Sequence, residues 1–198
     1  MKRRNPEYLK AERFILSMLE KKLSPSLLYH NLGHTLDVLH AAMVISDTEG
    51  LPSAERKLLR IAVLFHDAGF IYLYKDHEEK ACEMVREYLP GFNFTPEQIF
   101  SVCEMIMATR IPQDPKNRSG RIIADADLDY LGREDVNLIA QNLFEELRTY
   151  KLMPDRGKWI PFQIEFLKQH RYFTDYSRKH REPNKDRYLA SLIEGLPT

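Results

Sequence analysis

The chain has 198 residues, of which 43% are hydrophobic and 29% are charged, the usual balance of a globular protein. Its 29 Lys and Arg residues are matched by 29 Asp and Glu residues, so we expect neither general nucleic-acid binding nor attachment to an anionic membrane. The two cysteines, Cys82 and Cys103, lack metal or redox spacing, which excludes a disulfide framework and favours a reducing compartment. No signal peptide or membrane-spanning run is recognised, so a cytoplasmic protein is predicted.

Hydrophobic periodicity is helical along nearly the whole chain, and capping residues, prolines and glycines mark the boundaries. Asn5 is predicted to cap the first helix. Thr95 and Gln98 form a capping box at another helix start. Residues 110–120 hold two prolines and a glycine and are predicted to form a loop, long enough to serve as a lid. Helices are predicted at about 6–23, 33–48, 53–69, 76–88, 95–109, 121–131, 134–150, 160–180 and 183–194. The sequence therefore predicts an all-α bundle of about eight or nine helices.

Side chains of metal-ligand type occur at helix ends in this pattern. His34 opens the second predicted helix, and His66 and Asp67 close the third. Asp125 follows the predicted loop. Two imidazoles and two carboxylates suit a divalent transition metal. Because neighbouring helical residues point about 100° apart, His66 and Asp67 can reach one ion only at a helix end, which Gly69 provides.

Each of these residues also has a structural interpretation. His34 could be a core or capping residue. Asp67 could form a buried salt bridge, because an unpaired carboxylate in so apolar a stretch costs on the order of several kcal/mol. Asp125, like Asp127 and Asp129, could be a negative charge that complements a helix dipole. The residues alone therefore indicate a metal site without establishing it.

Three segments together resemble the HD superfamily of metal-dependent phosphohydrolases. They are YHNLGHT at 29–35, LFHDAG at 64–69 and IADAD at 123–127, which give the order H…HD…D within apolar helices. This similarity covers residues from about 25 to 132. It implies a helical-bundle fold in which the metal ligands are His34, His66, Asp67 and Asp125.

The similarity extends further along the chain. FLKQHRYFT at 166–174 resembles a subgroup of predicted HD phosphohydrolases. The resemblance thus implies one HD-type domain over residues 1–198, with a motif core at about 25–132. The C-terminal helices at 134–195 are expected to pack on that core.

Two further histidines are assigned roles by resemblance. His30 lies in Tyr29-His30-Asn31, which is similar to the segment of cyclic-nucleotide phosphodiesterases whose histidine is the general acid. The alternative is that His30 only forms a hydrogen bond to a neighbouring helix. His77 resembles a histidine that contacts phosphate or binds a second metal in several HD enzymes.

The resemblance also bears on the metal. Binuclear relatives carry a His-His pair where this chain has Thr109-Arg110, so one metal is expected. Histidine and carboxylate ligands suit Mn, Fe, Co, Ni or Zn, and Mg less well. The lack of thiolate ligands argues against a structural zinc site.

A phosphoester reaction requires an activated water and groups that neutralise phosphate. The metal would lower the pKa of bound water, and Asp67 or Asp125 would orient it. Arg110, beside the loop, and Arg171, in the basic segment 168–188, are candidates to bind phosphate. A solvated helix face explains that basic segment equally well.

The sequence therefore predicts a metal-dependent phosphohydrolase, either a phosphomonoesterase or a phosphodiesterase, acting on a nucleotide or similar small phosphate ester. One alternative is a cyclic-nucleotide phosphodiesterase. Others are a non-catalytic HD module that senses a nucleotide or metal, and a purely structural helical protein. The oligomeric state, including a homodimer, is left open by the sequence.

Overall fold

The computed structural model describes residues 6–195, and these residues form helices and loops without a strand. The prediction of an all-α fold is confirmed. Ten α-helices occur in this part of the chain, one more than the larger expected number. The helix cap predicted at Asn5 lies outside the described residues. Within 6–195, no helix is long and apolar enough to cross a membrane.

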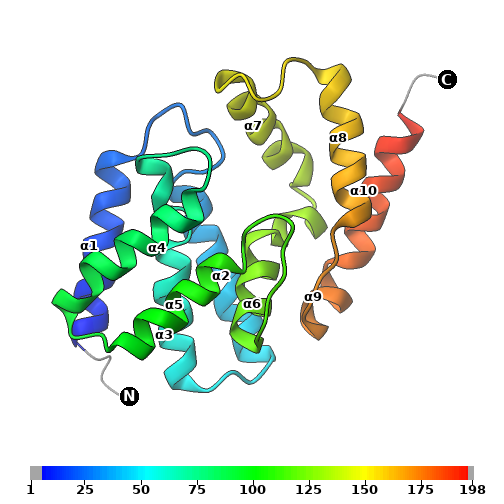
Figure 1. The fold of residues 1–198 in the computed structure, drawn as a ribbon. Helices are drawn as coiled ribbons and strands as arrows, with labels where there is room; N and C mark the ends of the chain where they lie inside the picture. The colour runs from blue at the N-terminus through cyan, green and yellow to red at the C-terminus, as the bar shows by residue number, and fades with distance from the viewer. Residues whose placement is uncertain (1–5, 196–198) are drawn as a thin grey trace.

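The first six α-helices surround the larger hydrophobic core (Figure 1). Their apolar faces contribute fully buried side chains such as Ile15, Ile45, Leu59 and Ile106. Short 3₁₀ helices, η1 and η2, flank α4 within this part. The bounds are α1 Pro6–Lys22, α2 Leu32–Thr48, α3 Ser53–Phe65, η1 Ala68–Ile71, α4 His77–Tyr88, η2 Leu89–Phe92, α5 Pro96–Met107 and α6 Arg118–Asp127.

The later helices lie beside this core, and α8 and α10 run next to each other (Figure 1). A second hydrophobic cluster joins them to Tyr29 and to residues around η3 such as Tyr130 and Leu131. The N- and C-terminal parts therefore share a boundary formed by the segment before α2 and by η3. The remaining bounds are η3 Asp129–Gly132, α7 Val136–Thr149, α8 Arg156–Gln169, α9 Asp175–His180 and α10 Glu182–Glu194.

The helix predicted over 160–180 is divided in the structure. Its chain leaves α8 at His170 and re-enters a helix only after Thr174, which caps α9 by accepting a hydrogen bond from the Ser177 amide. The backbone amides of Phe173 and Thr174 donate instead to the carboxylate of Asp125. A buried carboxylate from α6 thus satisfies amides that a continuous helix would have bonded internally. The prediction of one long helix was wrong for this reason.

The predicted loop after α5 is shorter than expected. Asn117 caps α6 by accepting a hydrogen bond from the Gly120 amide, so the helix begins at Arg118 and not at 121. The same helix ends at Asp127, and η3 replaces its predicted last turn. The capping box of Thr95 and Gln98 is present as predicted.

Gly69 allows η1 to approach the start of α4 closely. A Cβ atom on Gly69 would lie 1.9 Å from the carbonyl oxygen of His77, a backbone atom that cannot rotate away. We expect Gly69→Ala to lower the free energy of unfolding by about 1–3 kcal/mol through overpacking. Urea unfolding of both proteins measures this loss. Gly91→Ala is the matched control, since a Cβ there meets nothing within 4 Å; equal losses in the two variants would contradict the expectation.

His170 at the end of α8 provides a pH-dependent contribution to stability. Burial, reinforced by the positive charge of Lys185, lowers the pKa of His170 to about 3. Between pH 6.5 and about 3, His170 is therefore protonated in the unfolded chain but neutral in the folded chain. The free energy of unfolding consequently falls as the pH falls through this range. Between about pH 7 and pH 5 the loss from this group is expected to be about 2 kcal/mol.

This contribution is measured by urea unfolding of the wild type and His170→Phe at both pH values. The variant keeps an aromatic ring but cannot take up the proton, so its stability should fall by about 2 kcal/mol less than that of the wild type. Parallel losses in the two proteins would show that His170 does not carry the effect.

Candidate metal centre

The His-Asp doublet lies where the backbone leaves α3. The helix ends at Phe65, His66 is its C-terminal cap, and Asp67 precedes η1 with non-helical φ and ψ of −99° and 5°. The break lets both side chains point toward one centre, as the sequence requires, although it falls before Gly69. His34 arrives in the first turn of α2, where its amide donates to the cap residue Asn31.

Three side chains converge closely enough to hold one ion. Ligand atoms of His34, His66 and Asp127 lie within 4.8 Å of one another. The Nε2 atom of His34 is 3.1 Å from Oδ1 of Asp127, and Nε2 of His66 is 3.4 Å from that oxygen. Oδ2 of Asp67 lies 3.4 Å and 3.2 Å from the same two nitrogens. The resulting set is two imidazoles and two carboxylates.

Asp125 does not belong to this cluster, which corrects the predicted ligand set. Its Oδ1 accepts a hydrogen bond from the Phe173 amide at 2.9 Å, and its Oδ2 accepts from the amide and hydroxyl of Thr174. Residues two positions apart on a helix point about 200° apart, so α6 can present only one of Asp125 and Asp127 to the centre. Asp127 takes that place, and Asp125 holds the chain that follows α8.

His66 supplies the observation that favours a cation at the centre. Its Nδ1 lies 2.7 Å from the carbonyl oxygen of Val63, which can only accept, so Nδ1 carries the proton. When His66 is neutral, as a metal ligand must be, the lone pair of Nε2 faces two carboxylates. Both His66 Nε2 and Asp67 Oδ2 are buried without a hydrogen-bond partner among the described residues. Lone pairs facing one another in this way require a positive charge between them.

The pKa values of the metal-free chain also indicate that the carboxylates favour a positive charge at this centre. Burial acts to lower the pKa of His66, but the charge of Asp67, reinforced by Asp127, raises it well above the ordinary 6.5. Burial acts to raise the pKa of Asp127, yet the hydrogen bond from His34 and the charge of His66 lower it to about 2. The carboxylates therefore stay ionised, and the residues present fit a divalent transition ion.

His30 and His77 both stack on one phenyl ring beside the cluster. The ring of Phe70 stacks on His30 with centroids 4.2 Å apart and on His77 with centroids 4.0 Å apart. His77 Nε2 is 3.5 Å from Asp67 Oδ1, and all three of His30, His77 and Asp67 line the same cavity. The structure thus places both predicted histidines next to the centre.

Glu146 on α7 fixes the position of His30, and no pattern in the sequence indicated it. Its Oε2 accepts hydrogen bonds from the amides of Tyr29 and His30, and its Oε1 lies 2.5 Å from His30 Nδ1. The hydroxyl of Tyr74 also donates to Oε1. Burial acts to raise the pKa of Glu146, but the hydrogen bond from His30 and its charge lower it, so the carboxylate stays ionised. His30 therefore bonds to a neighbouring helix and also lines the cavity, and its role as the general acid stays a prediction.

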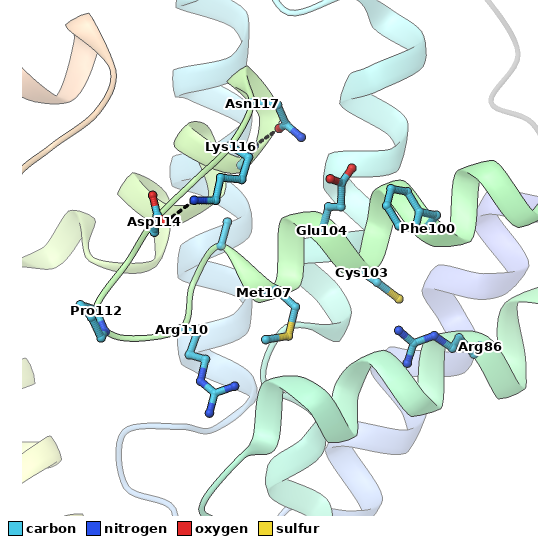
Figure 2. A pocket seen from close by; sticks show the side chains of 12 residues that line it. Arg86, Phe100, Cys103, Glu104, Met107, Arg110, Pro112, Asp114, Lys116 and Asn117 are labelled. Atoms are coloured by element: carbon cyan, nitrogen blue, oxygen red, sulfur yellow. Dashed lines mark hydrogen bonds and ion pairs between the residues drawn. The ribbon is translucent and has the colours of Figure 1, made fainter.

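The two arginines predicted to bind phosphate lie elsewhere. Arg110 forms exposed ion pairs with Asp76 and Glu79. Figure 2 shows it beside a separate pocket of about 430 Å³, whose wall includes Lys116 paired with Asp114. None of the four cluster residues lines that pocket.

Arg171 is also outside the cavity at the cluster. Its guanidinium lies over the ring of Phe173 at 5.6 Å, on the wall of a smaller pocket of about 200 Å³. The folded chain pairs or stacks both arginines on the surface, so the prediction that they bind phosphate at the centre is not supported by their positions.

The comparisons with known proteins agree with this geometry. A family model of the HD domain matches residues 31–129, half of the chain, and this range contains the four cluster residues. The fold is similar to the crystal structure of a predicted HD superfamily hydrolase from an uncultured Thermotogales bacterium. The TM-score is 0.62 at 20% identity, over 96% of this chain and 90% of the other. No curated protein matches the chain significantly.

Proposed function

This chain belongs to the HD domain family, and we propose that it is a metal-dependent phosphohydrolase that cleaves a phosphoester of a nucleotide or similar small phosphorylated molecule. The observation that carries the proposal is His66, which is fully buried and directs an unpaired nitrogen toward two ionised carboxylates. With His34 it completes a nitrogen-and-oxygen site of the kind that Mn, Fe, Co, Ni or Zn prefers.

The residues around this site divide the remaining tasks of hydrolysis. A divalent ion held by His34, His66, Asp67 and Asp127 would polarise a phosphoryl oxygen and lower the pKa of water toward about 7. In the metal-free chain the charge of His66 lowers the pKa of Asp67 against the effect of burial, and a bound dication would keep the carboxylate ionised in its place. An ionised Asp67 can accept a hydrogen bond from the attacking water and so orient it.

His30 is the candidate for protonating the leaving oxygen. Because the ionised Glu146 accepts from Nδ1, that nitrogen keeps its proton and the ring orientation is fixed. A proton carried on Nε2 is then the one available to the leaving group. The arrangement of an oriented imidazole beside a metal centre suits general acid catalysis, which contributes roughly 10²–10⁴-fold in rate.

Phosphate release tests the proposal. Protein stripped of metal is given Mn²⁺, Co²⁺, Ni²⁺, Zn²⁺ or Mg²⁺ with a panel of nucleotides and generic phosphate esters. We expect release that depends on the added ion and is lost in Asp67→Ala, which controls for contaminating phosphatase. Equal release by the two proteins would contradict the proposal. If no ion supports phosphate release but metal raises the melting temperature, the result would favour a non-catalytic sensing module.

A further inference from the structure

The cavity beside the metal centre extends well beyond the cluster. It has a volume of about 440 Å³, within the range of small-molecule sites. Asp67, Asp127, His30 and His77 form part of its wall, and leucines from α7 and from around η3 form another part. A substrate whose phosphate reaches the centre would therefore place the rest of its body against an apolar surface.

One wall is a row of aromatic rings along α8. Trp159, Phe162 and Phe166 are spaced three and four residues apart, so they share one face of the helix. The rings of Trp159 and Phe162 stack with centroids 5.7 Å apart, and those of Phe162 and Phe166 stack at 6.5 Å. All three line the cavity, and Phe162 remains 49% exposed. Exposed aromatic surface of this kind in a cavity marks a ligand-binding wall.

The permanent charges of the cavity wall are negative. No lysine or arginine is found among the described residues that line it, and its acidic residues are Asp67, Glu78, Asp127 and Glu165. A phosphate at the metal has a positive partner, and His30 and His77 lie beside the centre, but a second or third phosphate further along the cavity would meet no lysine or arginine. The cavity is therefore unsuited to a diphosphate or triphosphate.

Three polar side chains in the rest of the wall already have a hydrogen-bond partner. The amide of Gln163 donates to the hydroxyl of Tyr188 at 2.9 Å, and the hydroxyl of Thr109 donates to the carbonyl of Ile106. The amide of Gln169 donates to Glu165. A substrate rich in hydroxyl groups would have to break such pairs or leave its own groups unsatisfied.

We propose that the substrate is a phosphate monoester whose alcohol part is apolar and uncharged, and that this part lies along the aromatic wall of α8. The proposal rests on the proposed phosphohydrolase function and narrows its substrate class. It also explains why Arg110 and Arg171 are absent from the site, because a single phosphate held by a dication needs no further cation.

Alkyl phosphates test the substrate class, since their leaving groups are chemically alike. With the activating ion present, we expect kcat/KM to rise by roughly 200-fold from butyl phosphate to octyl phosphate when all four added methylenes are buried. Glycerol 3-phosphate, AMP and ATP should all be poorer substrates than octyl phosphate. A preference for any of these three, or rates independent of chain length, would overturn the proposal.

Phe162 allows the wall itself to be tested. Phe162→Ala should lower the ratio of kcat/KM for octyl phosphate over glycerol 3-phosphate by about tenfold, and Phe162→Leu should restore part of it. Phe100→Ala is the matched control, because Phe100 on α5 is 64% exposed and lies outside this cavity. Equal ratios in wild type and Phe162→Ala would contradict binding along α8.

Binding without turnover separates failure of this inference from failure of the proposed function. Trp159 is the single tryptophan of the chain and lines the cavity, so its fluorescence reports on occupancy. In protein loaded with a divalent ion we expect a saturable change with octyl phosphate, read before turnover, and a smaller one with glycerol 3-phosphate. A larger fluorescence change with octyl phosphate, but no hydrolysis of any ester, would contradict the proposed phosphohydrolase function and uphold the apolar site. Hydrolysis without a larger fluorescence change for octyl phosphate would uphold the phosphohydrolase function and contradict the apolar substrate site.

Discussion

Replacing Asp127 by asparagine is expected to lower the affinity for a divalent transition ion by about two orders of magnitude or more and to abolish metal-dependent hydrolysis. Oδ1 of Asp127 is the oxygen that both His34 and His66 approach, and its negative charge is the one an ion would neutralise. Isothermal titration with Mn²⁺ or Zn²⁺ on stripped protein measures the affinity, and phosphate release measures the activity.

Asp125→Asn is the matched control on the same helix. The new amide nitrogen would face the amide or hydroxyl of Thr174, two donors that now share Oδ2. We expect a loss of about 1–3 kcal/mol in the free energy of unfolding and little change in metal affinity of the folded protein. Loss of the metal from Asp125→Asn, with retention in Asp127→Asn, would reverse the assignment made from the structure.

Glu146→Gln is expected to reduce kcat by roughly 10²–10⁴-fold while leaving metal affinity largely intact. The carboxylate accepts from two backbone amides, from His30 Nδ1 and from Tyr74. A glutamine has one acceptor oxygen, so some of these donors would lose their partner, and the ring of His30 would lose its fixed orientation.

Glu145→Gln controls for the removal of a charge from the same turn of α7. Among the described residues, the side chain of Glu145 pairs with Arg148 and Gln141 on its own helix, and Glu145 is not one of those that line the cavity. Its replacement should change kcat and the melting temperature little. An activity in Glu146→Gln equal to that in Glu145→Gln would exclude a positioning role for Glu146.

The helical fold and the order of the motif residues are properties of the local sequence. Caps such as Asn31, Thr95 and Asn117 and the helical spacing of apolar residues act over a few positions, so they can be recognised without a structure. His34, His66 and Asp67 were placed at helix ends by the same local signals, and the structure brings all three together.

The errors arise where distant segments meet. Asp125 and Asp127 occupy one short helix and have the same chemistry, and only the packing of α6 against α2 decides which carboxylate faces the histidines. The segment 170–174, between α8 and α9, contains no proline or glycine to end a helix. Its break depends on Asp125, a residue about 48 positions earlier that binds the amides of Phe173 and Thr174.

The amino-acid sequence alone predicted an all-α chain, because helix formation is a local property, and its resemblance to the HD superfamily predicted the H…HD…D ligand set. The tertiary structure decided that Asp127 completes the cluster, that Glu146 holds His30, and that the arginines lie outside the cavity. These outcomes depend on contacts between residues separated by up to 117 positions, such as Tyr29 and Glu146. Side chains so far apart in sequence meet only after the helices have packed, and no local pattern encodes which of them will be buried together.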